Sequence, residues 1–234
     1  MRAFKYILFL LIFPFFSISY AQDFVGYVSV KGTAKFDKRP IKDAVVNLYV
    51  NGTKKNVMNA LPNGKFEIQL DYNNVYQIEV TAKGLTSKRI EINTNVPDKE
   101  KENIIQYKFV LELFEYYEGL DTSPLQQPVA KISFSDKYGD FDFDPEYTQM
   151  MRRKIDQVER ELKSLRAQAY AKKISEADKL FKAENYKEAI IKYDEAIDID
   201  PFQDYPDDMI WECEERMRET KQESATYDRL IAKG

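Results

Sequence analysis

The chain of 234 residues contains no histidine and only one cysteine, Cys213. The usual zinc sites and the serine or cysteine triads need histidine or several cysteines as metal ligand, base or nucleophile. The 8 glycines are scattered and form no glycine-rich loop of the kind that cradles phosphates. The scarcity of these residues predicts a protein that is not an enzyme and that holds neither a cofactor nor a metal ion.

One run of carboxylates invites a calcium interpretation, because Asp140, Asp142 and Asp144 stand at alternate positions. An EF-hand loop would require glycine at its sixth position and glutamate at its twelfth. Pro145 and Met151 occupy those places. Alternation of Asp with Phe is typical of a strand with Phe inward and Asp outward, and we favour that interpretation.

The single cysteine excludes an intrachain disulfide. Cys213 shares an apolar stripe with Met209, Ile210 and Met217. We therefore expect it to be a small buried hydrophobic residue, with an intermolecular disulfide as the alternative.

Residues 1–21 have the pattern of a signal peptide. A short basic start precedes the apolar run "YILFLLIFPFFSIS", and Ser19 and Ala21 supply the small residues of a cleavage site. The run is short for a membrane anchor, which is the alternative. We expect cleavage before Gln22, release into the periplasm, and no membrane insertion afterwards. The residue directly after the cleavage site is Gln22 and not cysteine, so we expect no lipid attachment of the bacterial lipoprotein type.

Charged residues make up 32% of the chain, and the formal net charge is −4. A mildly acidic chain with mixed charges presents no basic surface for phosphate backbones or anionic lipids. We therefore expect no nucleic-acid partner.

The front half has the period-two pattern of strands. In "KFEIQLD", for example, Phe66, Ile68 and Leu70 share one face, and polar residues occupy the other. The pattern predicts seven strands, at 24–36, 44–50, 53–61, 65–71, 75–82, 88–94 and 104–115. Strands with one apolar face need two sheets that cover each other, so the fold expected here is a β-sandwich.

Three segments of this half, "VKGTAKFDKRPIKDAVVNLYVNG", "PNGKFEIQL" and "YQIEVTAKGL", resemble the carboxypeptidase regulatory-like domain. The resemblance covers about seventy residues and includes Gly32 and Asn63-Gly64. It implies an immunoglobulin-like, transthyretin-like sandwich that serves as a spacer or docking domain in Gram-negative envelope proteins. A linker-like stretch and two further strand patterns extend it, so we place this domain at 22–144.

Residues 145–234 have the pattern of helices. Asp144-Pro145-Glu146 is a helix start, and no glycine or proline follows until after Glu184. An apolar stripe within 150–169 predicts either a helix packed on its neighbours, which we favour, or a coiled-coil homodimer. The overall class is therefore α+β, with two domains and a long connecting helix.

Residues 170–203 resemble a tetratricopeptide repeat. The segment "FKAENYKEAIIKYDEAIDIDP" places Ala189, Tyr193, Ala196 and Pro201 at the family's small, aromatic and terminating positions, and Ala177 at the small position of the first helix. Lys173 and Glu176 depart from the family, which has an aromatic residue and leucine there. Such a repeat holds other proteins. A single repeat needs cover, which the preceding helix and a capping helix after residue 203 would supply.

The resemblance places Ile174, Asp178, Phe181 and Lys182 on the inner face of the repeat, where partners bind in related proteins. We predict an apolar groove with a charged rim, unless the preceding helix covers Ile174 and Phe181.

These patterns together predict a non-catalytic adaptor of the cell envelope that holds envelope proteins in the periplasm. The alternative is a permanent structural subunit of an envelope assembly, such as a type IX secretion or gliding apparatus.

Overall fold

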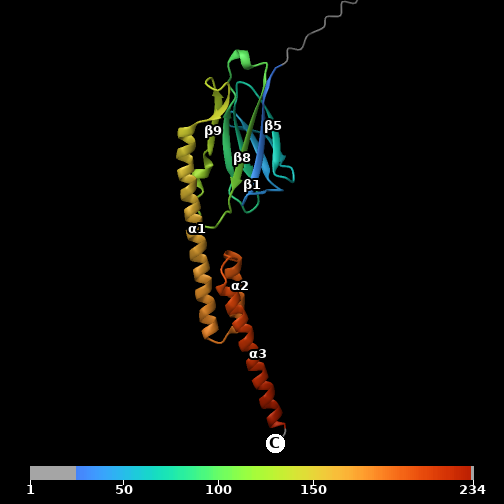
Figure 1. Cartoon of the computed structure of the whole chain (residues 1–234), viewed down its shortest axis with the longest axis vertical. Helices are drawn as coiled ribbons and strands as arrows, with labels where there is room; N and C mark the ends of the chain where they lie inside the picture. The colour runs from blue at the N-terminus through green and yellow to red at the C-terminus, as the bar shows by residue number, and fades with distance from the viewer. Residues whose placement is uncertain (1–24, 233–234) are drawn as a thin grey trace, which may run out of the picture.

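The computed structural model describes residues 25–232 and has two β-sheets followed by three helices (Figure 1). The strands are β1 (Tyr27–Phe36), β2 (Arg39–Pro40), β3 (Val45–Val50), β4 (Thr53–Asn59), β5 (Lys65–Asp71), β6 (Val75–Thr81), β7 (Lys88–Asn93), β8 (Ile104–Leu113), β9 (Ala130–Ser135) and β10 (Asp140–Phe143). The helices are α1 (Pro145–Lys182), α2 (Tyr186–Ile199) and α3 (Tyr205–Ile231), and η1 (Asp98–Glu100) and η2 (Ser123–Gln126) are short 3-10 turns. The predicted α+β class is confirmed.

The strands form one four-stranded and one six-stranded sheet. In the smaller sheet β1 pairs with β5 and β2 antiparallel and with β8 parallel. The larger sheet has the order β10-β9-β7-β6-β3-β4, in which only β7 and β9 run parallel. The seven predicted strands all occur, which confirms the sandwich-like arrangement of the front half.

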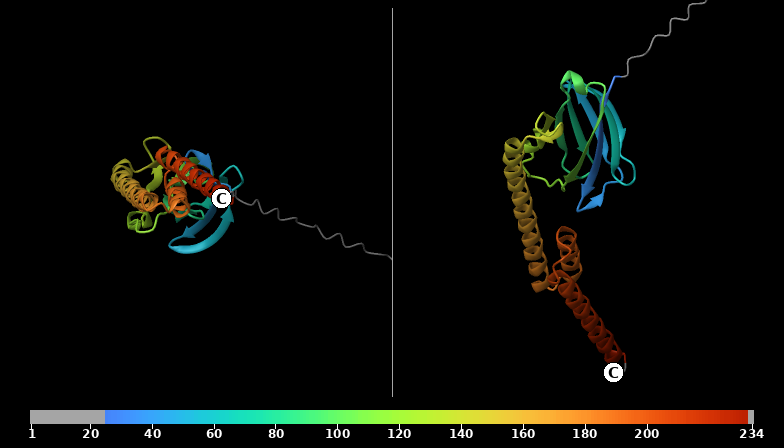
Figure 2. Two further views of the ribbon diagram at one scale, coloured as in Figure 1. Left: turned by 90° about the horizontal axis from the view of Figure 1, so that it is seen from below. Right: turned by 45° about the horizontal axis from the view of Figure 1, so that its top comes forward.

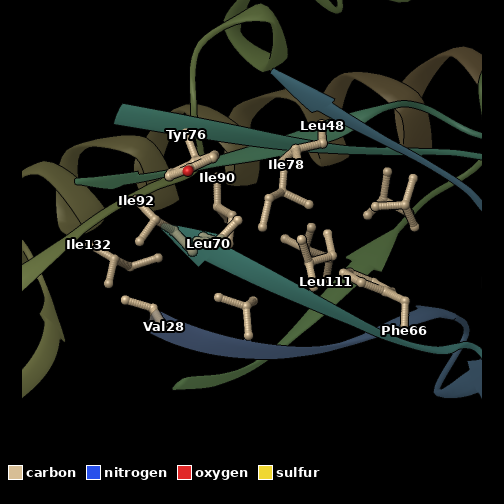
Figure 3. Packing of buried hydrophobic residues seen from close by; sticks show 14 of the residues in the cluster. Val28, Leu48, Phe66, Leu70, Tyr76, Ile78, Ile90, Ile92, Leu111 and Ile132 are labelled. Atoms are coloured by element: carbon tan, nitrogen blue, oxygen red, sulfur yellow. The ribbon is translucent and has the colours of Figure 1, made fainter. Parts of the chain in front are cut away.

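The core lies between the two sheets, where the inward side chains of alternate residues meet (Figure 3). Leu70, Ile78 and Ile92 are fully enclosed, with 0% of each residue exposed. The burial of β5 alternates strictly between exposed and buried, as the period-two pattern predicts.

Gly32 on β1 provides space for an aromatic side chain of the neighbouring strand. It lies opposite Phe66 of β5 on one side and Phe109 of β8 on the other. A Cβ atom at Gly32 would lie 2.1 Å from the Phe66 ring, which covers this glycine. The Phe66 and Phe109 rings pack edge to face, with centroids 5.8 Å apart. Glycine is required here because the ring occupies the space of a side chain.

The expectation that each strand has an apolar face turned to the core is wrong for β4. Its residues are exposed, except for half-buried Met58. The reason is its position at the edge of the larger sheet, where it pairs only with β3. Lys54 and Lys55 on this strand discourage pairing with other chains.

The strand interpretation of the Asp-Phe alternation is confirmed, because β10 pairs antiparallel with β9. Phe141 points inward and is 5% exposed, but Phe143 is 48% exposed. Asp140 and Asp142 each accept the backbone N–H of the next residue, at 2.7 and 2.8 Å. Their carboxylates therefore serve the local backbone.

Helix α1 begins where the sequence predicts. Asp144 caps it by accepting the backbone N–H of Tyr147 at 2.9 Å. The apolar stripe of its first half packs on the segment that follows β8. This cluster consists of Leu120, Leu125, Val158 and Leu162, with Phe114, Tyr117, Ile155 and Leu165 around it. The stripe is thus occupied within the chain, as the favoured interpretation expects, and a homodimer through 150–169 stays a prediction.

The boundary at residue 144 also stays a prediction, because α1 belongs to both parts. It runs beside the sandwich and then continues to α2 and α3 (Figures 1 and 2). Its first half supplies Val158 and Leu162 to the cluster under the sandwich. A fragment ending at 144 would lose that cover. The signal peptide expected at 1–21 lies outside the described residues.

Candidate partner-binding site

The four residues predicted to bind a partner lie on the last turns of α1. Ile174, Asp178 and Phe181 share one face, since residues three and four apart are neighbours on a helix. Ile174 and Phe181 are half-buried against a small helical core, whereas Lys182 is exposed. That core consists of Ala177, Ala189, Tyr193 and Cys213, each 0% exposed. The burial of Cys213 agrees with its expected role as a small hydrophobic residue.

Asp178 joins the three helices. Its Oδ1 atom accepts the hydroxyl of Tyr193 from α2 at 2.7 Å and that of Tyr205 from α3 at 2.9 Å. The two rings pack edge to face, 6.2 Å apart. Burial and the hydrogen bond to Asp178 raise the pKa of Tyr193 far above its usual range, so its hydroxyl stays a donor. The Oδ1 atom of Asp178 is therefore occupied by hydrogen bonds within the chain.

Phe181 packs edge to face on Tyr186 of α2, with ring centroids 5.5 Å apart. The preceding part of α1 cannot cover Phe181 or Ile174, because α1 is one continuous helix and cannot fold back on itself. The cover that the sequence left open comes from α2 and α3. A role of Ile174, Asp178, Phe181 and Lys182 in binding a partner remains a prediction.

Lys173 and Glu176, which depart from the repeat pattern, take part in an ion cluster. Lys173 Nζ lies 2.5 Å from Glu195 Oε2 on α2, and Lys192 Nζ lies 2.8 Å from Glu195 Oε1. The two lysines lower the pKa of the Glu195 carboxyl, chiefly through hydrogen bonds. Because these groups are partly exposed, the cluster contributes to helix orientation more than to stability.

Apolar side chains remain uncovered on the outside of the helical part. Ile191 on α2 is 55% exposed, Trp211 on α3 is 60% exposed, and Phe202 between them is 90% exposed. Single exposed apolar residues are ordinary. They indicate a binding surface only where they lie near an exposed segment that has no packing partner among the described residues.

The second half of α3 is such a surface. Every residue from 218 to 231 is exposed, and this segment, called distal α3 below, projects away from the other helices (Figures 1 and 2). Tyr227, Leu230 and Ile231 at its end are 63–66% exposed. Helices in proteins draw most of their stability from packing an apolar face. Distal α3 therefore has the form of a helix that lacks its packing partner.

Arg166 ties the helical part to the sandwich. Its Nη2 atom donates to the carbonyl of Ile199, near the C-terminus of α2, at 2.6 Å. Its Nη1 atom lies 3.3 Å from Glu115 Oε2, just after β8. A cation is favoured at the negative end of a helix dipole. One side chain thus connects α1, α2 and the end of the sandwich.

Arg166→Met is expected to loosen this connection without unfolding either part. The side chain is 39% exposed, so we expect a loss of about 1 kcal/mol or less in the free energy of unfolding. Small-angle X-ray scattering should show a broader distribution of end-to-end distances. Arg160→Met, at an exposed position on the same helix, is the control. An unchanged distribution in Arg166→Met would mean that α1 alone fixes the arrangement.

A cavity of about 670 Å³ lies beside Arg166, between the lower end of the sandwich and the α2–α3 loop. Its lining includes Phe36, Lys88, Phe114 and Phe202. Lys88 is 8% exposed, and its ammonium lies over the Phe114 ring, 4.8 Å from the centroid. The alternation of β7 could have predicted the inward side chain of Lys88, because Lys88 is in phase with the buried Ile90 and Ile92.

Within residues 25–232, no three metal-ligating side chains gather in one place. In the same part of the chain, no helix combines the length and apolar character required to cross a membrane. Both statements concern the described residues alone.

Comparison with known proteins gives no family. No family model and no curated protein matches the chain. Among solved structures, 3-chlorocatechol 1,2-dioxygenase from Rhodococcus opacus 1CP matches at a TM-score of 0.31 and 8% identity, over 42% of this chain and 62% of that one. Catechol 1,2-dioxygenase from Acinetobacter sp. ADP1 matches at 0.31 and 13%, over 46% and 59%. A protein of unknown function from Bacteroides fragilis NCTC 9343 matches at 0.29 and 12%, over 41% and 30%. The chain thus spans less than two thirds of each.

These matches correct the expectation that the chain is not an enzyme. That expectation rested on missing residue types, yet solved structures similar to the chain include catechol 1,2-dioxygenases. A likeness at TM-scores of 0.30–0.31 assigns no activity to this chain either.

Proposed function

We propose that this protein is an interaction adaptor of the bacterial cell envelope, exported to the periplasm, whose helical end binds another envelope protein. The observation that carries the proposal is distal α3, a helical segment with exposed apolar residues and no packing partner within the described chain. Apolar helix faces of this kind are anchors for helix-in-groove or helix–helix recognition.

We also propose that α1 and α2 pack as a tetratricopeptide repeat and that the sandwich is a carboxypeptidase regulatory-like domain. Tetratricopeptide-like packing of α1 against α2 is supported by Ala177, Ala189 and Ala196, which are each 0% exposed. Small residues at such positions allow two helices to approach closely. The assignment of the sandwich to the carboxypeptidase regulatory-like group is supported by Gly32 and Gly64. Gly64 has a φ of +72° and packs against the Ala34 carbonyl, where a side chain would clash.

A test of this function removes distal α3 from the protein in its native host. A chain ending at Met217 should retain its melting temperature within a few degrees, because every side chain from 218 to 231 is exposed. Affinity purification from the periplasmic fraction should lose the partner that the full chain retains. The N-terminus of the recovered protein should be Gln22.

The matched variants are Tyr227→Ser with Leu230→Ser and Ile231→Ser, against the control pair Ser224→Ala and Thr226→Ala on the same segment. The apolar set should reduce partner recovery at least about tenfold, since truncating an anchor costs roughly 2 kcal/mol or more. Equal recovery with both sets would contradict the proposal. Fixed stoichiometry in a complex that survives high salt would favour the permanent structural subunit over the adaptor.

A further inference from the structure

Strand β8 has one edge without a strand beside it. All ten of its residues pair with β1, and no other described strand extends the sheet on its far side. The backbone N–H and C=O groups of such an edge can pair with another chain. β8 contains no proline, and its sequence "IIQYKFVLEL" alternates apolar and polar residues. Its free edge is therefore a competent template for an added strand.

A slot of about 580 Å³ runs along this edge, between β8 and α1. Four consecutive residues of β8, Phe109 to Glu112, line it. Consecutive residues of a strand point to opposite faces, so a cavity that meets all four follows the edge of the strand. Its lining also includes Ile90 and Ile132 of the larger sheet and Thr148 and Ile155 of α1. The volume is within the ~300–1,000 Å³ typical of ligand pockets.

Two polar side chains that line the slot lack partners among the described residues. Thr148 Oγ1 is buried without a hydrogen bond. Lys88 is more than nine-tenths buried, and its ammonium contacts the Phe114 ring but forms no hydrogen bond or salt bridge within residues 25–232. Burial lowers the pKa of Lys88, while Glu159 and Glu112 oppose that shift. Buried polar groups normally have partners, so Thr148 points to a missing ligand, while the Lys88 ammonium, which is not itself fully buried, offers a positive charge at the slot.

We propose that the β8 slot receives an extended segment of a partner protein, which pairs with the free edge of β8 and places an acidic side chain against Lys88. Apolar side chains at alternate positions would face Ile90, Ile132 and Ile155. Val110 and Phe143, at the rim, are 56% and 48% exposed and would be covered. This surface is separate from distal α3, and the inference does not depend on the proposed function.

Two features favour a polypeptide over a compact small molecule. The unpaired backbone of β8 offers hydrogen bonds at strand spacing, which only another extended chain can match along its length. Lys88 and Glu112 also line the 670 Å³ cavity beside Arg166, so the two cavities adjoin at these side chains. The two glutamates that act on Lys88, Glu112 and Glu159, are both exposed, and solvent screens their charges. Glu112 also accepts the backbone N–H of Lys38 at 2.9 Å.

The test is a selection of phage-displayed random ten-residue peptides on the immobilised full chain. We expect enriched peptides to alternate apolar and polar residues and to carry Asp or Glu at a fixed position. The best peptide is then synthesised and titrated by calorimetry. Methylation of its backbone nitrogens at alternate positions should abolish binding in one register and spare it in the other, because only one set of N–H groups faces β8.

The matched variants are Lys88→Met on β7 and, as control, Lys108→Met at an exposed position of β8. Lys88→Met should weaken binding of the acidic peptide about tenfold or more. The melting temperature of the free protein should not fall, because a desolvated charge is removed. Lys108→Met should change neither quantity. A lysine with a purely structural role would give the reverse: a lower melting temperature and unchanged peptide affinity.

Several results would overturn the proposal. These are no enrichment above a surface without protein, equal affinity for Lys88→Met and the parent chain, or indifference to the register of N-methylation. Concentration-dependent dimerisation that protects β8 amides from hydrogen exchange would also overturn it, by assigning the edge to a second copy of the chain.

Discussion

Tyr193→Ala is expected to unfold the helical part while the β-sandwich stays folded. Tyr193 is 0% exposed and is the largest fully buried side chain of the described residues. Replacing a buried aromatic residue with alanine costs ~3–5 kcal/mol. The substitution also removes a donor to Asp178 and the ring that packs on Tyr205. The residues clustered with it, Ala177, Ala189 and Cys213, are small, so the helical core cannot absorb that loss.

Hydrogen exchange followed by mass spectrometry measures this outcome. Amides of α2 and the first half of α3 should exchange rapidly in Tyr193→Ala, while those of β1, β5 and β6 stay protected. Tyr227→Ala, which truncates a 65% exposed tyrosine of α3, is the control and should leave both patterns unchanged. Simultaneous loss of protection in the sheets would show that the two parts unfold as one cooperative unit.

Gly32→Ala is expected to destabilise the sandwich by about 1–3 kcal/mol, the usual cost of overpacking a core. The added methyl group would lie 2.1 Å from the Phe66 ring. The ring must shift to admit this methyl group, and because Phe66 is 5% exposed and packs edge to face on Phe109, that shift disturbs the aromatic pair. Chemical denaturation followed by tyrosine fluorescence would report the free energy of unfolding.

A double-mutant cycle separates this clash from other effects. Phe66→Ala alone should cost ~3–5 kcal/mol. In that background Gly32→Ala should cost little, because the ring that it meets has gone, so the two changes are strongly non-additive. Gly119→Ala is the comparison, since a methyl group there meets nothing within 4 Å and costs only backbone strain at a φ of +86°. Additive costs at Gly32 and Phe66 would contradict the contact as the cause.

Local patterns determined most of the secondary structure. Strand alternation depends only on neighbours along the chain, and the seven expected strands occur with boundaries shifted by three residues or fewer. The start of α1 at Pro145 follows from its capping residue. The burial of Ala177, Ala189 and Tyr193 likewise follows from their spacing.

The sequence also placed Lys88 in phase with Ile90 and Ile92, yet an inward lysine has no meaning until its surroundings are known. Whether its ammonium meets a carboxylate, a ring or an open slot depends on β8 and α1, which are distant in the chain. Arg166 is a similar case, since its partners Glu115 and Ile199 are 51 and 33 residues away.

Most strands and helices, and the apolar face of each, could be predicted from the chain alone, because these depend on short-range geometry with fixed periods. What covers each face depends on how the elements pack together. The stripe of α1 meets Leu120 and Leu125, β4 remains exposed at an edge, and one edge of β8 is left without a strand. The physical reason is that apolar burial is non-directional: the pattern requires that a face be covered but does not specify which segment covers it.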